Sequence, residues 1–198
     1  ESRGLGDVYK RQPQDSPLRK AVVISNPLGE DFSIMRTISL NGMLTSLSTN
    51  FNRRNKNVRL YELGNIYLPK QVPVTELPEE RMQFTLGMYG EGDFFTMKGV
   101  IEEFLYKAGM KLKPEYDPEA GKPFLHPGRQ ANVVYDGTVI GYLGEVHPTV
   151  AANYAIKERV YVAVLDMPEI VSRTSFDHKY EGIAKFPAAA RDISMVVP

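Results

Sequence analysis

Residues 131–146 read ANVVYDGTVIGYLGEV, two β-rich runs joined by Asp136-Gly137. Asp-Gly suits the two central positions of a type I′ turn, whose twist matches that of two paired strands. The valine, isoleucine and tyrosine residues on either side favour an extended backbone. The stretch therefore predicts a β-hairpin with strands over 131–135 and 138–146, and with it an antiparallel sheet.

Further strands are predicted on both sides of this hairpin. Residues 58–68 and 81–89 read as two long strands, because the connection between them contains prolines that would interrupt a helix. We expect these two strands to pair as antiparallel neighbours. Additional strands are expected at 20–24, at 159–166 and from Ile193 into the C-terminus.

Two amphipathic helices are predicted between the strands. Over 40–51 the apolar residues fall at intervals of three and four. Asp93 stands where an N-cap belongs and Gly109 where a left-handed residue ends a helix, so 94–108 predicts a second helix with its aromatic residues in the core. Short helices are expected to begin at Pro148 and Pro168. Strands outnumber helices, which predicts an α+β fold on a mainly antiparallel sheet.

The composition narrows the class of protein. Lysine plus arginine equal aspartate plus glutamate at 24 each, so no overall field draws the chain to nucleic acid or anionic lipid. The absence of cysteine excludes a disulfide framework and a thiolate metal site. No apolar run approaches the roughly 20 residues of a membrane span. We therefore expect a cytoplasmic protein without a membrane partner.

The first residues are expected to lie outside the fold. The stretch 1–12 has no hydrophobic periodicity and is followed by Pro13 and Pro17. This pattern is typical of a disordered leader or an expression remnant. We interpret residues 1–19 as such a leader.

The chain lacks the strong motifs of catalysis. It has no phosphate-cradling glycine loop, no His-x-x-x-His pair and no Gly-x-Ser-x-Gly elbow. For His126 and His147 a hydrogen-bonded structural role is favoured over metal ligation or general-base catalysis, because no carboxylate cluster accompanies them. The basic run 53–57 is interpreted as a solvated helix end, with an RNA contact as the less favoured alternative. The residues alone lead to an α+β domain without a visible active site.

Five motifs, in order, resemble one family. They are NPLGEDFSIMRT at 26–37, YELG at 61–64, FFTMKG at 94–99, HPGR at 126–129 and GEVHP at 144–148. Together they are similar to the β subunit of bacterial-type phenylalanyl-tRNA synthetase, over about residue 20 to the end.

The resemblance implies a fold and a domain division. In this family the matching region is a degenerate copy of the class II aminoacyl-tRNA synthetase core, an antiparallel sheet flanked by helices, here expected over 20–175. The strings KFP at 185–187 and RDIS at 191–194 resemble the start of a ferredoxin-like anticodon-binding domain. We therefore expect 176–198 to be a linker and the first, truncated part of that domain. The first class II motif should lie upstream of residue 20.

Comparison with the catalytic class II pattern implies that the chemistry is lost. Leu68 and Lys70 stand where the second motif has an arginine, which grips the ATP α-phosphate, and an acid. A leucine offers no donor to a phosphate, and a lysine cannot copy the bidentate guanidinium fork. Ile170 stands where the third motif has another arginine, after the bulky Leu165 and Met167. The segment 124–126 replaces a Phe-Pro-Phe segment of the phenylalanine pocket.

The resemblance implies a scaffold that is non-catalytic in itself. It is expected to pack against the catalytic α subunit in a heterotetramer, and to meet tRNA mainly through other domains. ATP and magnesium are expected in the holoenzyme, and no cofactor in this part. The alternative is a stand-alone synthetase paralogue, either an enzyme or a ligand-binding protein. The residues expected to fix turns or form interfaces are Asn26, Pro27, Arg36, His126, Gly128, Arg129, Gly144, Glu145, His147 and Pro148.

Overall fold

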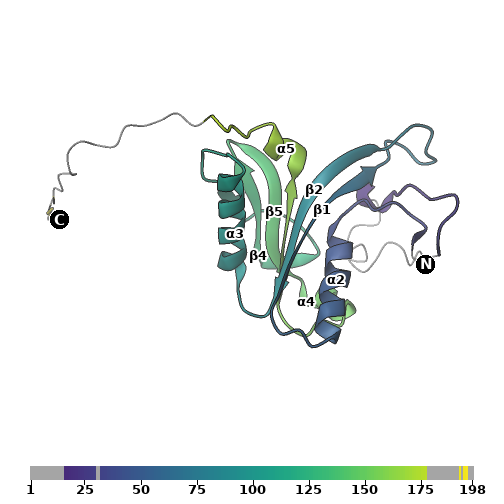
Figure 1. Ribbon diagram of the computed structural model, residues 1–198, viewed down its shortest axis with the longest axis horizontal. Helices are drawn as coiled ribbons and strands as arrows, with labels where there is room; N and C mark the ends of the chain where they lie inside the picture. Colours follow the sequence, from purple (N-terminus) through teal and green to yellow (C-terminus); the bar gives the residue numbers. More distant parts are fainter. Residues whose placement is uncertain (1–15, 30–31, 178–191, 193, 196–198) are drawn as a thin grey trace.

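The chain folds around a six-stranded antiparallel sheet with the strand order β1-β2-β6-β5-β4-β3 (Figure 1). The computed structural model describes residues 16–29, 32–177, 192 and 194–195. The predicted α+β class is confirmed. In chain order the elements are the 3-10 helix η2 (Pro17–Arg19), α2 (Leu40–Asn52), β1 (Val58–Leu68), β2 (Glu79–Tyr89), α3 (Phe94–Lys107), β3 (Glu115–Asp117), β4 (Leu125–Tyr135), β5 (Thr138–Val146), α4 (Pro148–Asn153), β6 (Val160–Asp166) and α5 (Met167–Val171).

Strands β1 and β2 form the predicted long antiparallel pair. Their register runs without a break from Val58 opposite Tyr89 to Leu68 opposite Glu79. Strand β6 then pairs with β2 on one side and with β5 on the other. The last long strand along the chain therefore lies in the middle of the sheet, between strands that precede it by many residues.

The hairpin of β4 and β5 has the predicted turn. Asp136 has a φ of 47° and Gly137 a φ of 72°, the two positive values that a type I′ turn requires. Strand β4 begins at Leu125, six residues before the predicted start at 131. This extension was not predicted because proline and glycine, both present in 126–129, are unfavourable in strands. The register with β5 is irregular in the same stretch.

The two long helices agree with prediction at their ends. The Asp93 side chain accepts from the backbone N–H of Thr96 and so caps α3, and Gly109 follows the helix with a φ of +86°. The expected burial of every aromatic residue of α3 is wrong for Phe95 and Tyr106, which are 72% and 70% exposed. Neighbouring residues on a helix point about 100° apart, so Phe94 and Phe95 cannot both face the sheet.

Two short strands differ from prediction. The expected strand at 20–24 is a single bridge between Val23 and Ile34, because the turn residues at 25–29 leave no partner for a longer ladder. Strand β3 was not predicted, because three residues flanked by prolines carry no period-2 signal. The strand predicted from Ile193 lies outside the described residues.

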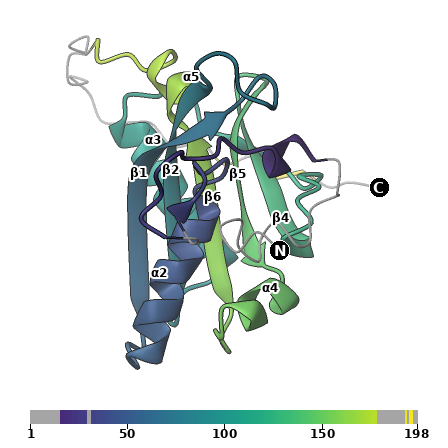
Figure 2. The same ribbon diagram turned by 90° about the vertical axis from the view of Figure 1, so that its right-hand side faces the viewer.

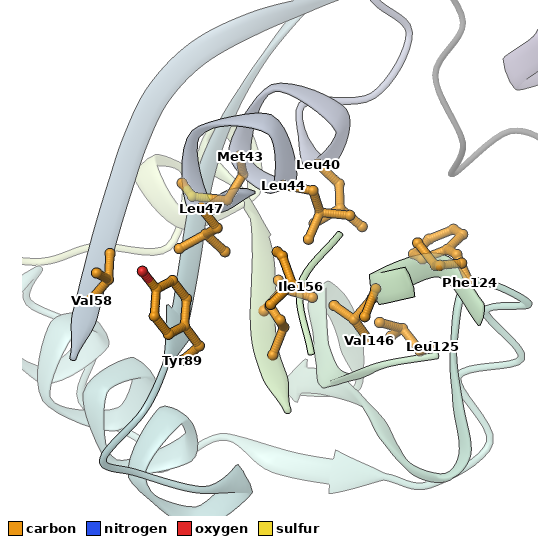
Figure 3. Close-up of a cluster of buried hydrophobic side chains, with 14 of the residues drawn as sticks. Leu40, Met43, Leu44, Leu47, Val58, Tyr89, Phe124, Leu125, Val146 and Ile156 are labelled. Atoms are coloured by element: carbon orange, nitrogen blue, oxygen red, sulfur yellow. The ribbon is translucent and has the colours of Figure 1, made fainter. Parts of the chain in front are cut away.

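Each face of the sheet carries its own hydrophobic cluster. Helices α2 and α4 cover one face and α3 and α5 the other (Figures 1 and 2). Strand β6 serves both faces, since Val160 and Val162 belong to the first cluster and Tyr161 and Leu165 to the second. In Figure 3 the α2 side chains of the first cluster lie above Val58, Tyr89 and Ile156.

Candidate functional site

An ion pair with a buried carboxylate joins β4 to β5. The Nη1 atom of Arg129 lies 3.0 Å from Oε1 and 2.9 Å from Oε2 of Glu145. The Glu145 side chain is only 4% exposed, whereas that of Arg129 is 44% exposed. A carboxylate at this depth requires a charged partner, because its hydration has been lost. Arg129 therefore offsets the free-energy cost of burying the Glu145 carboxylate, and the ion pair links β4 to β5.

Gly144 allows β4 to approach β5 closely beside this pair. A Cβ atom at Gly144 would lie 2.8 Å from the carbonyl oxygen of Arg129 and 3.0 Å from a methyl group of Leu125. Gly128 has no such neighbour, since the nearest atoms are those of the His126 ring at 3.8 Å. The two motif glycines thus differ, and only Gly144 is required by a close backbone contact.

The two His-Pro segments share one local hydrogen-bonding pattern. The Nδ1 atom of His126 accepts from the backbone N–H of Gly128 at 3.1 Å, and that of His147 from the N–H of Thr149 at 3.2 Å. His147 is the N-cap of α4, whose first residue is Pro148. In both rings Nδ1 therefore acts as a hydrogen-bond acceptor. Both rings shape the local backbone.

Pro127 and His147 line a small pocket of about 200 Å³. His126, Arg129, Glu145 and Pro148 border a larger, open pocket of about 700 Å³. His126, Arg129 and Glu145 line one side of it. Pro148 and the small alanine residues of α4 line another, and the connection 155–159 completes the wall. The sequence motifs HPGR and GEVHP therefore meet in space, although they lie on different strands.

Arg36 lies apart from this pocket, at the outer edge of β1. Its Nη1 atom pairs with Glu62 at 2.5 Å, and its Nε donates to the carbonyl oxygen of Asn65 at 2.8 Å. The N–H of Tyr67 donates to the Arg36 carbonyl oxygen at 2.9 Å. Arg36 therefore pairs with backbone groups along the exposed edge of β1.

Asn26 and Pro27 are exposed in the turn between Val23 and Ile34, and they do not line the pocket.

The positions that the resemblance compares with class II catalytic residues are occupied by core or paired side chains. Leu165 and Ile170 are 0% and 1% exposed in the second cluster. Phe124 and Leu125 are 3% and 1% exposed in the first cluster (Figure 3). Lys70 pairs with Glu76 at 3.0 Å on the surface. These side chains serve packing or local pairing.

An ion-pair network around Arg81 was not predicted from the sequence. Its Nε atom lies 2.5 Å from Asp166 of β6, and its Nη2 atom lies 3.3 Å from Glu169 of α5. The hydrogen bond with Asp166 raises the pKa of Arg81. Arg173 also pairs with Glu169, at 2.6 Å. No local pattern could reveal a pair separated by 85 residues. The signal that the sequence did contain was a pair of opposite charges at strand ends, Arg81 near the start of β2 and Asp166 at the end of β6.

The described residues contain no group of three or more histidine, cysteine, aspartate or glutamate residues that could hold a metal ion. Within the same residues, no helix has the length and apolar character needed to cross a bilayer.

Together, the fold and the site define an α+β domain whose distinctive polar residues fasten strands and shape turns. The chain belongs to the family described as the phenylalanyl tRNA synthetase beta chain CLM domain, whose model matches residues 6–167. The match begins within the stretch interpreted as a leader and ends before the predicted anticodon-binding segment. The boundaries at residues 20 and 175 stay predictions.

Curated relatives carry the same description. The chain is 44% identical over 185 residues to the phenylalanine–tRNA ligase beta subunit of Clostridium acetobutylicum, and 40% identical over 185 residues to that of Clostridium tetani; each alignment covers 93% of this chain. The beta subunit of Symbiobacterium thermophilum is 34% identical over 198 residues, again covering 93% of this chain. The chain spans 22 to 23% of the length of these relatives.

Proposed function

We propose that this chain is a class II synthetase-like, catalytically degenerate domain of a phenylalanine–tRNA ligase β subunit. Its role is to scaffold the catalytic α subunit for the ATP-dependent attachment of phenylalanine to tRNA. The whole enzyme is a heterotetramer that acts in the cytoplasm, and the ATP and magnesium of the reaction belong to the α subunit.

The burial of Ile170 is the observation that carries this proposal. A phosphate clamp at that position would need a guanidinium that reaches a ligand, and here the side chain is 1% exposed in a hydrophobic cluster. Leu165, five residues earlier, is equally buried. Without preorganised cations, adenylate formation loses the charge stabilisation that its transition state needs. The residues in these positions stabilise the domain.

Co-expression with the catalytic α subunit tests the scaffold role. We expect the two chains to elute together in size-exclusion chromatography, and the isolated chain to catalyse no phenylalanine-dependent exchange between ATP and pyrophosphate. Exchange activity in the isolated chain would contradict the proposal. Separate elution would mean that the surface needed for assembly lies outside this chain.

A conservative variant distinguishes a structural role of Arg129 from a catalytic one. Arg129→Lys keeps a positive charge beside the buried Glu145. In the assembled enzyme we expect it to leave turnover unchanged, because Arg129 acts by holding β4 to β5. An Arg129→Lys enzyme that melts and assembles normally and yet loses turnover would contradict a scaffold role.

A further inference from the structure

Two basic segments far apart in the sequence carry exposed cations that form no ion pair with any residue that the structure describes. The first, 53–57, follows α2, and the second, 157–159, precedes β6. They hold five cations and one carboxylate, Glu158. All eight residues are exposed. The cations, here called the basic end, are Arg53, Arg54, Lys56, Lys157 and Arg159.

The sheet register brings the two segments to the same end of the domain. Tyr89 lies opposite Val58 on one side and opposite Val160 on the other. Strands β1 and β6 therefore begin at the same level of the sheet, with β2 between them. Two strand spacings separate their first residues by about 10 Å. The hydroxyl group of Tyr89 also donates to the carbonyl oxygen of Asn55 at 2.8 Å. Figures 1 and 2 both place the C-terminal end of α2 and helix α4 at this end.

The basic end is distinguished by the number of cations that it gathers. Within the described part of the chain, none of its five side chains forms an ion pair. Cations that pair with carboxylates include Arg36, Lys70, Arg81, Lys98, Lys107, Arg129 and Arg173, whereas Lys111 and Lys113 resemble the basic end in forming no such pair among the described residues. The chain as a whole is neutral, so the excess positive charge here is a local feature. Such a local excess raises the concentration of anions near it.

We propose that the basic end contacts the phosphate backbone of RNA. Flexible, exposed lysine and arginine side chains suit phosphates better than base edges, so the contact positions RNA without reading its sequence. A lipid surface fits less well, because interfacial binding needs large apolar side chains beside the cations. Neither segment contributes an exposed large hydrophobic residue. The inference rests on the proposed function for the kind of RNA, which is tRNA.

Salt-dependent tRNA binding by the 198-residue chain tests the contact. The test variant is Lys56→Gln with Lys157→Gln. The matched control is Lys111→Gln with Lys113→Gln, two exposed lysines beyond the far end of α3. Each phosphate contact contributes nearly one unit to the slope of log K against log salt, so the test variant should lose about two units of slope and bind about tenfold or more weakly. The control should bind tRNA as the unaltered chain does.

Three results would overturn the inference. They are no tRNA binding by the unaltered chain at low salt, equal slopes for test and control variants, and binding to phosphatidylserine vesicles without binding to tRNA. Thermal melts should show that both variants remain folded, since all four lysines are exposed. Co-elution with the α subunit is measured on the same variants. Its failure would place the surface needed for assembly outside this chain, whereas a changed salt slope reports only on the RNA contact.

Discussion

Both carboxylate oxygens of Glu145 accept hydrogen bonds from one nitrogen of Arg129, at 3.0 and 2.9 Å. The carboxylate is nearly inaccessible to water, whereas the guanidinium is half-exposed. The pair is therefore asymmetric: removing the arginine leaves a buried charge, and removing the glutamate leaves a cation that water can still reach.

This asymmetry predicts the outcome of a double-mutant cycle. Arg129→Met should destabilise the chain by about 3 kcal/mol, because Glu145 is left buried and unpaired. Glu145→Leu should cost less, and the double variant should be more stable than Arg129→Met alone. Urea unfolding of the four proteins measures the coupling. Strictly additive effects would show that the two side chains do not depend on each other.

The two motif glycines should respond differently to alanine. Gly144→Ala places a Cβ 2.8 Å from the Arg129 carbonyl oxygen, and we expect it to destabilise the chain by about 2 kcal/mol through overpacking. Gly128→Ala is the matched control, with its nearest neighbours at 3.8 Å, and should change stability by no more than about 0.5 kcal/mol. Urea midpoints distinguish the two. Equal effects would contradict the close approach of β4 and β5 at Gly144.

Introducing an arginine at position 170 should not produce nucleotide binding. Ile170→Arg buries a charge in the second cluster and should destabilise the chain by at least about 4 kcal/mol. Ile170→Val, which keeps the apolar character, should cost about 1 kcal/mol. Unfolding curves and ATP calorimetry on both variants check this. A stable Ile170→Arg protein that binds ATP would contradict the packing role of this position.

Acid should weaken the capping of α3. Hydrogen bonds from Thr96 lower the pKa of Asp93 below its ordinary value of 3.8. The stability from this ionised cap is therefore fully present above pH 3.8 and is lost as the pH falls through the lower folded-state pKa. Asp93→Asn keeps a capping oxygen but cannot titrate. Its unfolding free energy should fall less between pH 5 and pH 2 than that of the unaltered chain, as denaturant titrations at several pH values would show.

Local elements could be predicted from the amino-acid sequence wherever their signals lie within a few residues. Asp136-Gly137 fixed the hairpin because the turn needs two positive φ angles, and Asp93 with Gly109 marked α3 because they satisfy backbone groups at its ends. The order of the five motifs also indicated the family. The same local signals failed for β3 and for the start of β4, where prolines and glycines obscured strands that pairing with neighbours maintains.

The contacts between residues that are distant in the sequence depend on the three-dimensional fold. The insertion of β6 between β2 and β5 brings Arg81 to Asp166, and places 157–159 beside 53–57. The three-dimensional fold also determines that Ile170 is buried and that Arg129 is paired with Glu145. Turn and cap preferences act over a few bonds, whereas these contacts depend on the order and register of strands. Burial on both faces of the sheet selects that order.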